Sequence, residues 1–392
     1  MTIETNDVHP FRIAIPQSQV DDLRRRLSDT RWPTGPAVDG WSRGIPVDHL
    51  RDLAEHWGSG YDWRAHEARL NELPQFTTTI DGQRIHFAHV RSPEPDALPL
   101  IVAHGYPSSF AEMAGLVGPL TDPRAHGGDP ADAFHLVIPS LPGFGFSTPV
   151  SEPGWEVGRT GRAFAELMRR LGYDRYAAHG GDIGAGVTGE LAKVDGDHVV
   201  ATHVNTDPTA LALVGGILPD EVDGLSDDES AWLDHWRQYG EEGRGYLEIQ
   251  TTRPRTLAYG LTDSPVAQLA WIAEKFEEWT GLGGSPGTID RDELLTTVSI
   301  YWFTGSGASA ADFIYDAAHA EVDWGAVTDV PSGFAVFAAG PVVRKVLDAD
   351  HRIEHWSEFA EGGHFPALEV PDLLVGDLRT YFRSFRSHRS GR

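Results

Sequence analysis

The chain has 392 residues, enough for one large domain with an inserted or appended subdomain and a sizeable buried core. Its 58 acidic and 32 basic residues give a formal net charge of -26, so we expect no nucleic-acid partner, because binding to phosphate backbones relies on basic residues. There are no cysteines, which excludes disulfides, thiolate zinc sites and cysteine nucleophiles. Neither Met1–Pro10 nor any other stretch has an apolar run long enough for a signal-peptide core or a membrane span, which predicts a soluble, cytoplasmic protein with no membrane partner.

The N-terminal region predicts one amphipathic helix and a packed aromatic stretch. An alternating, strand-like run over residues 11–15 stops at Pro16. In residues 20–32, Val20, Leu23 and Leu27 then share one helical face. The aromatic residues in and beyond this helix are more typical of packing than of ligand binding: Trp32, Trp41, Trp57, Tyr61 and Trp63.

From residue 76 the pattern predicts an α/β domain. Residues 76–80 and 84–90 form a β-hairpin pattern around an Asp-Gly turn. Short apolar strands then alternate with helical stretches, which favours a mainly parallel sheet flanked by helices on both faces. These strands are predicted at residues 98–103, 135–139, 175–181, 199–204 and 333–338.

Between Asp207 and about Ala326 the alternation gives way to helical, Trp-rich segments, which predicts an inserted helical cap. The expected organisation is an N-terminal region at 1–75, an α/β core at 76–206 and 327–392, and a cap at 207–326.

The peptide at residues 176–186 is typical of a nucleophile elbow. A strand runs into small residues around one acid and then into a helix, with Asp182 where an esterase would have serine. Gly180 and Gly184 flank it at positions where a sharp turn requires small residues. We therefore predict that Asp182 is the nucleophile. The alternative is a glycine-rich turn in which Asp182 only caps the next helix.

The peptide His104–Pro107 follows the predicted strand at 98–103, where hydrolases with such an elbow build an oxyanion hole. One backbone N–H comes from this loop and one from the residue after the nucleophile, so Tyr106 and Ile183 are the candidates. A simple Gly-Pro turn is the alternative.

A histidine on a glycine-rich loop near the C-terminus is the candidate base. His364 lies in residues 361–366, after the predicted sheet and before an amphipathic final helix at 368–378. In an α/β-hydrolase the nucleophile precedes the acid and the histidine along the chain, as it does here.

Five motifs, in order, make the chain resemble the microsomal-type epoxide hydrolases over nearly its whole length. Residues 11–33, from Phe11 to Thr-Arg-Trp-Pro, resemble the N-terminal lasso segment of that family. The other motifs lie at residues 104–107, 180–184, 263–265 and 362–365. The resemblance implies an α/β-hydrolase fold with an inserted helical cap and a lasso, acting on an epoxide and water.

The resemblance also implies the chemistry. Asp182 would open the epoxide to form an alkyl-enzyme ester, and His364 would activate the water that releases a vicinal diol. The family uses two cap tyrosines as donors to the ring oxygen. Tyr246, in residues 245–250, matches the first. Tyr315 is our choice for the second, although an ungapped comparison puts Ile314 there; either tyrosine could instead pack within the cap.

One position departs from the family pattern. The carboxylate that supports the histidine usually follows the strand predicted at 333–338, where this chain has Gly340. Without an acid, ester hydrolysis should slow. Asp207, at the end of a neighbouring strand, is the predicted replacement, and Asp348 and Asp350 are weaker candidates.

Two other functions stay open. A dehalogenase uses the same Asp-His chemistry, but a halide needs an N–H donor such as an indole beside the nucleophile, and Ile183 stands there. An inactive binding homologue is suggested by Gly340. We expect no metal and no cofactor, since no His pair lies at ligand spacing beside a carboxylate in the key loops.

The chain further resembles epoxide hydrolases of bacterial secondary metabolism, including enediyne antibiotic biosynthesis, which implies a bulky, aromatic-bearing epoxide. The oligomeric state is open, with a homodimer as the alternative to a monomer.

Overall fold

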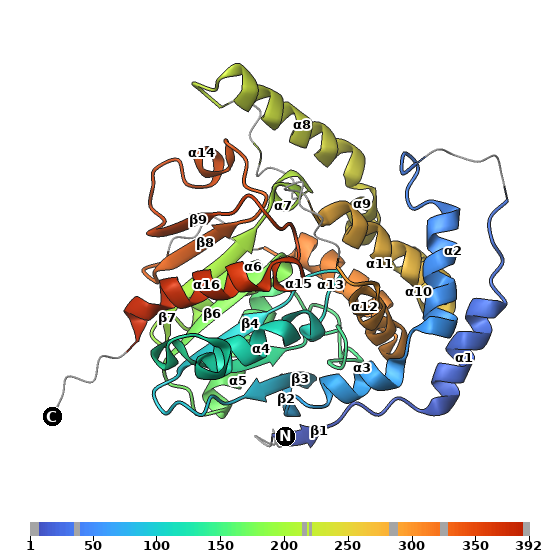
Figure 1. Ribbon diagram of the computed structural model, residues 1–392, viewed down its shortest axis with the longest axis horizontal. Helices are drawn as coiled ribbons and strands as arrows, with labels where there is room; N and C mark the ends of the chain where they lie inside the picture. The colour runs from blue at the N-terminus through green and yellow to red at the C-terminus, as the bar shows by residue number, and fades with distance from the viewer. Residues whose placement is uncertain are drawn as a thin grey trace.

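The computed structural model describes residues 8–34, 40–213, 218, 222–281, 289–321 and 328–386. At its centre lies a nine-stranded sheet in the order β1-β2-β3-β5-β4-β6-β7-β8-β9 (Figure 1). The pairings among β1, β2, β3 and β5 are antiparallel, and those from β5 through to β9 are parallel. The strands are β1 His9–Phe11, β2 Gln75–Ile80, β3 Gln83–Val90, β4 Leu98–Ala103, β5 Phe134–Pro139, β6 Tyr176–Gly181, β7 Val199–Thr206, β8 Ser332–Val336 and β9 His355–Glu358.

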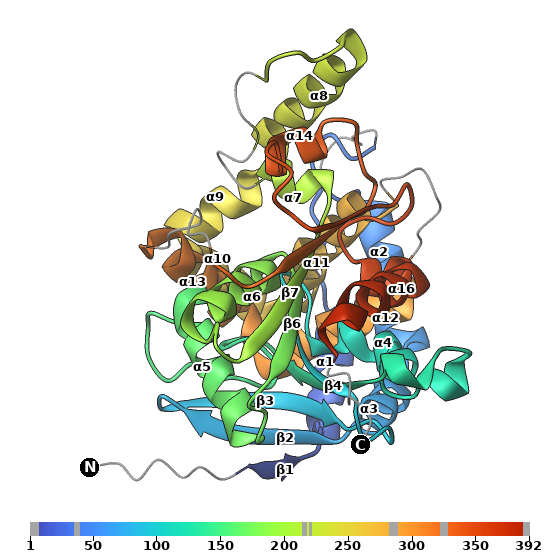
Figure 2. The same cartoon turned by 90° about the vertical axis from the view of Figure 1, so that its left-hand side faces the viewer.

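Helices cover both faces of the sheet. Helices α5 (Val157–Arg170) and α6 (Ile183–Val194) lie together on one face, and α4 (Ala114–Thr121) and α16 (Pro371–Phe382) on the other (Figure 2). The central strands are mostly apolar because both faces are buried; all six residues of β5 are buried, His135 among them. On α5, Phe164 and Leu167 are fully buried, and each contributes about 1.5–3 kcal/mol relative to an exposed side chain.

The cap helices lie between β7 and β8 along the chain and beside the sheet in space (Figure 1). Serine side chains cap the N-termini of two of them: Ser226 forms a capping box with Glu229, and the Ser264 hydroxyl accepts a hydrogen bond from the backbone N–H of Ala267. The described helices are α7 Pro208–Leu213, α8 Asp227–Gly243, α9 Gly245–Thr252, α10 Pro254–Asp263, α11 Pro265–Trp279, α12 Arg291–Thr304 and α13 Ser306–His319.

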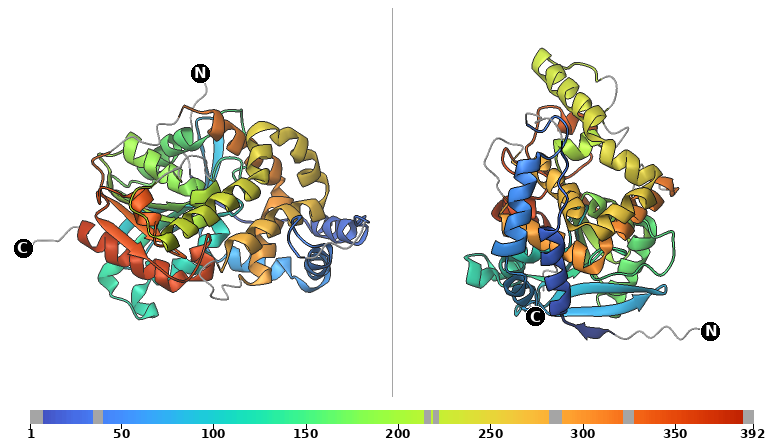
Figure 3. Two further views of the ribbon diagram at one scale, coloured as in Figure 1. Left: turned by 90° about the horizontal axis from the view of Figure 1, so that it is seen from above. Right: turned by 90° about the vertical axis from the view of Figure 1, so that its right-hand side faces the viewer.

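The N-terminal helices lie against the cap (Figure 3). Arg26 donates to the backbone oxygen of Asp263, and the Trp57 indole donates to Ser299. These helices are α1 Gln17–Ser28, α2 Val47–Glu55, a π-helical turn His56–Gly60 and α3 Trp63–Leu70. The remaining short elements are 3-10 turns at Phe110–Met113, Pro123–His126, Pro130–Asp132 and Arg383–Phe385, and helices α14 Val343–Leu347 and α15 Pro366–Glu369.

The predicted α/β-hydrolase architecture is confirmed, and so is the hairpin predicted at residues 76–80 and 84–90. Several boundaries were wrong. The strand predicted at 333–338 ends at Val336, and Ala338 has a φ of 46°, outside the extended range. The final helix begins at Pro371, which is suited to a first helical turn, and not at residue 368. Among the described helices, none is both long and apolar enough to cross a membrane.

Candidate active site

Asp182 lies at the turn between β6 and α6, where the backbone is strained. Its φ and ψ are 53° and -127°, a region that residues with a side chain rarely occupy. Glycines make this turn possible, because a Cβ at Gly180 would collide with the backbone of Gly184, and one at Gly184 with the backbone oxygen of Ala103. The strand-turn-helix sequence thus presents the Asp182 carboxylate beyond the carboxyl end of β6.

One oxygen of Asp182 is held by the loop that follows β4. The backbone N–H of Tyr106 donates to Oδ1 over 2.8 Å, and the N–H of Ile183 also bonds to the carboxylate. Tyr106 and Ile183 are the two N–H donors predicted for an oxyanion hole, and the structure brings them together. The second oxygen, Oδ2, faces His364.

His364 lies between two carboxylates. Its Nε2 is 3.5 Å from Asp182 Oδ2, and its Nδ1 is 2.8 Å from Asp207 Oδ2. The other oxygen of Asp207 accepts from the backbone N–H groups of Thr209 and Ala210 over 2.8 and 3.2 Å, and from the Thr209 hydroxyl. Asp207 therefore occupies the place of the orienting acid in a catalytic triad.

The charges of this triad shift the pKa values of its members. Burial acts to raise the pKa of Asp182, but the hydrogen bond and charge of His364 and the N–H groups of Tyr106 and Ile183 outweigh it and lower that pKa. Burial acts to lower the pKa of His364, but the charge of Asp207 and the bonds to both carboxylates raise it well above its ordinary value. The site therefore holds an ionised Asp182 at neutral pH.

Position 340 has no room for a side chain. A Cβ on Gly340 would collide with the indole ring of Trp232 from α8. Trp232 packs with Leu211 and Val343 in a small apolar cluster. Asp348, on the same segment, is buried and accepts from the backbone of Arg352 over 2.6 Å. His364 is therefore paired with Asp207, whereas Asp348 is hydrogen-bonded to the backbone of Arg352.

Tyr246 lies over the site from α9. Its ring is parallel to that of Tyr106 at 6.3 Å and meets the Trp279 ring edge-on at 5.5 Å. Burial and the nearby charge of Asp182 raise the pKa of Tyr246 well above its ordinary value, so its phenol is a neutral donor at pH 7.

Tyr315 does not join this group. It is 36% exposed, its ring stacks on His319, and it lines a separate hollow of about 530 Å³ beside Trp155 and Arg253. Its neighbour Ile314 is 8% exposed. The expectation that Tyr315 is the second ring-opening tyrosine has no support from this geometry, because α13 turns its side chain outward.

Sequence reasoning missed two neighbours of the triad. The backbone oxygen of Trp279 accepts from the N–H of His364 over 2.9 Å, and its ring lies 4.7 Å from the imidazole. Glu112 is buried and lines the same small cavity as Asp182 and His364. The sequence did offer a signal for Glu112, because it is the only acid in the apolar run 110–117, and an acid in such a run is unusual unless it has a partner or a function.

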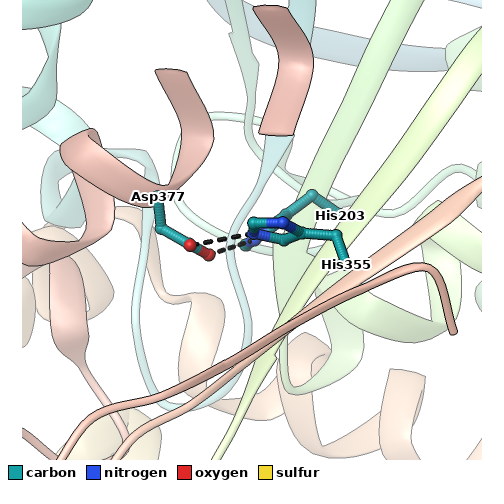
Figure 4. A group of neighbouring side chains, drawn as sticks. All are labelled: His203, His355 and Asp377. Carbon is teal, nitrogen blue, oxygen red and sulfur yellow. Dashed lines mark hydrogen bonds and ion pairs between the residues drawn. The ribbon is translucent and has the colours of Figure 1, made fainter. Parts of the chain in front are cut away.

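A second polar cluster lies away from the nucleophile. His203 from β7 and His355 from β9 both point at Asp377 of α16, with Nε2–O distances of 2.8 and 2.9 Å (Figure 4). The possible ligand atoms of His203, His355 and Asp377 all lie within 4.8 Å of one another, a spacing at which they could hold a metal ion.

The positions of the protons on these histidines favour a hydrogen-bonded network over a metal site. His179 Nδ1 lies 3.1 Å from the His203 carbonyl, which only accepts, so His179 Nδ1 carries a proton. The same atom is 3.0 Å from His203 Nδ1, which must then offer its lone pair. His203 Nε2 therefore carries an N–H that donates to Asp377 and has no lone pair for a metal.

The fold and this site define an α/β-hydrolase whose elbow carries the carboxylate of Asp182. Residues 8–113 match the family model described as epoxide hydrolase N terminus. The chain is 42% identical to the protein named "Putative epoxide hydrolase" of Stigmatella aurantiaca, over 97% of this chain and 86% of that protein. It is 31% identical to epoxide hydrolase 1 of Sus scrofa, over 96% of this chain and 89% of that protein.

Among solved structures, Aspergillus niger epoxide hydrolase superposes with a TM-score of 0.82 and 32% identity, covering 97% of both chains. The chain therefore belongs to the microsomal-type epoxide hydrolase family. It is an enzyme of the hydrolase class that converts an epoxide and water into a vicinal diol.

Proposed function

We propose that this chain opens its epoxide by attack of Asp182 Oδ2 on a ring carbon, which gives an alkyl-enzyme ester. One observation carries the proposal: a single strained turn sets an ionised carboxylate between two backbone N–H donors and the His364–Asp207 pair. In the attack the Oδ2–carbon bond forms as the ring carbon–oxygen bond breaks. Oδ1 stays on the N–H groups and becomes the ester carbonyl oxygen.

Tyr246 is the proposed donor to the departing ring oxygen. An alkoxide is a poor leaving group unless a hydrogen bond or proton reaches it, and a neutral phenol supplies one. The position of Tyr246 over Asp182 supports this role.

His364 is the proposed base of the second step. Esterification removes the negative charge of Asp182, one of the two charges that raise the pKa of His364. The imidazole thus becomes easier to deprotonate when the ester forms. Asp207 then keeps the remaining proton on Nδ1 and leaves Nε2 free to accept a proton from water.

The test traps the ester. His364→Gln should form a covalent adduct with styrene oxide on the peptide that contains Asp182, and Asp182→Asn should form none, as measured by intact and peptide mass spectrometry. Wild type in ¹⁸O water should carry the label into Asp182 after one turnover with excess enzyme. If neither adduct nor diol forms, the chain is a binding protein; halide release from bromoalkanes without diol formation would favour a dehalogenase.

For the substrate, we propose a bulky epoxide that bears an aromatic group. Support comes from the aromatic rings that surround the nucleophile, those of Tyr106, Tyr246 and Trp279. A panel of aromatic and aliphatic epoxides with chiral product analysis tests this; equal kcat/KM for both classes would contradict it. The homodimer, the cytoplasmic location and the place in secondary metabolism stay predictions.

A further inference from the structure

A small cavity adjoins the nucleophile in the described part of the chain. Its volume is about 10 Å³, and it is lined by Asp182, His364, Glu112, Ser108 and Asn205, among others. This is about the space that one water molecule needs. Water in a protein interior is retained where polar groups can hydrogen-bond to it, and several such groups line this cavity.

Two of these polar groups lack an assigned role. Glu112 stands on the 3-10 turn that follows the oxyanion loop, is 6% exposed, and has no basic partner among the described residues within salt-bridge distance. The Ser108 hydroxyl is buried without a partner in hydrogen-bond geometry, although it lies near enough to Glu112 to act on the acid's pKa. An unpaired buried polar atom costs about 1–3 kcal/mol, and one bound water would give the Ser108 hydroxyl a partner.

We propose that Glu112 is a positioning residue for the water that hydrolyses the Asp182 ester, with Ser108 as its second partner. The inference rests on the proposed function above. A water in this cavity is in reach of Glu112 and His364 together, because both line a space of its own size. Glu112 accepts one hydrogen of the water and so turns the other toward His364 Nε2.

The water proton moves to His364 Nε2 while the water oxygen bonds to Cγ of Asp182. The resulting oxyanion is held by the N–H groups of Tyr106 and Ile183. Its collapse breaks the Cγ–O bond to the alkyl group, and His364 returns the proton to the departing oxygen, which completes the diol. Asp182 is left as a carboxylic acid, and its proton restores the Tyr246 phenol that protonated the ring oxygen in the first step.

The ionisation of Glu112 suits this role. Burial raises the pKa of Glu112, the charges of Asp182 and Glu369 add to this rise, and Ser108 and His364 oppose it, so that the pKa is raised to about 7. Esterification of Asp182 removes one of the raising charges, so the glutamate becomes a better acceptor at the stage when the water is needed.

The experiment separates the two chemical steps by rapid quench with excess enzyme over styrene oxide. In Glu112→Gln and Glu112→Leu, ester formation should stay within about threefold of wild type, while ester decay should slow by about 100-fold, the cost of misplacing a reacting group. Glu67→Gln, which alters a buried glutamate of α3 that does not line this cavity, is the matched control and should leave both rates near wild type.

Ester decay at the wild-type rate in Glu112→Leu would overturn the assignment. So would an equal loss in both steps together with a lowered Tm, because that pattern marks a structural role. If wild type itself forms no Asp182 ester, the proposed function fails, and the role of Glu112 fails with it; normal ester chemistry in all variants refutes Glu112 alone.

Discussion

Replacing Asp207 with asparagine should stop the enzyme at the ester. The oxygen of Asp207 that does not face His364 accepts from Thr209 and Ala210, and these N–H groups require an acceptor. The asparagine oxygen must therefore take that position, which turns its NH2 group toward His364 Nδ1. Since NH2 only donates, the imidazole must accept at Nδ1 and carry its proton on Nε2. The atom that should accept a proton from water is then already protonated.

The magnitude follows from the loss of the correct tautomer. In a Ser-His-Asp triad the same substitution lowers kcat by about 10⁴, and we expect ester hydrolysis to slow by about 10³–10⁴ here. That corresponds to about 4–5.5 kcal/mol at 1.4 kcal/mol per factor of ten. Formation of the ester should change far less, because Asp182 keeps its N–H donors and Tyr246 keeps its phenol. Asp207→Asn should thus accumulate adduct in a rapid-quench and mass-spectrometry assay.

Asp348→Asn is the control for this experiment. It removes a carboxylate of similar burial that bonds to the backbone N–H groups of Arg352 and Ile353 and makes no contact with His364 in the described structure. Ester decay should stay near the wild-type rate. Wild-type decay in Asp207→Asn would refute the reasoning, and a selective loss in Asp348→Asn would assign the supporting acid there.

Three further outcomes are expected. Asp182→Asn should form neither adduct nor diol, and diol formation at the wild-type rate would exclude Asp182 as the nucleophile. Tyr246→Phe should slow ester formation by about 100-fold, whereas Tyr315→Phe should stay within about twofold; the reverse order in rapid-quench data would exchange their roles. Burial acts to raise the pKa of Asp377, but its bonds to two histidines and Ser357 lower it, so its ionised form stabilises the fold at neutral pH. Asp377→Asn should therefore lose about 2 kcal/mol of unfolding free energy in urea at pH 7. The difference from wild type should shrink below about pH 4, because the Asp377 carboxyl group takes up a proton in the unfolded chain while it stays ionised in the fold, and a difference that is constant with pH would contradict this.

The elbow could be predicted because its requirements are local. A strand, a strained residue between glycines and a following helix are contiguous in the sequence, and the close approach at Gly184 leaves little choice of residue. The proximity of His364 and Asp207 needed one more step, namely that neighbouring parallel strands end at the same edge of the sheet. That inference is general to the fold, and the structure brings the two side chains to 2.8 Å.

The cap could be predicted only in outline. Successive residues on a helix are rotated by about 100°, so an error of one position exchanges an inward side chain for an outward one. Ile314 and Tyr315 are such a pair, and the motif alone did not decide between them. Trp279 and Glu112 were missed for a related reason: their places beside His364 depend on contacts between elements distant in the chain.

The shift of the acid from position 340 to position 207 involves several linked features. The indole of Trp232 fills the place where a side chain at 340 would project, so a carboxylate cannot simply return there. At 207 the backbone already requires an acceptor, because α7 begins at the next residue and its first N–H groups need a partner. One carboxylate meets both needs: one oxygen serves the start of α7 and the other orients His364. The bonds to α7 also fix the rotation of the carboxylate, so the triad contact forms without ordering a free side chain.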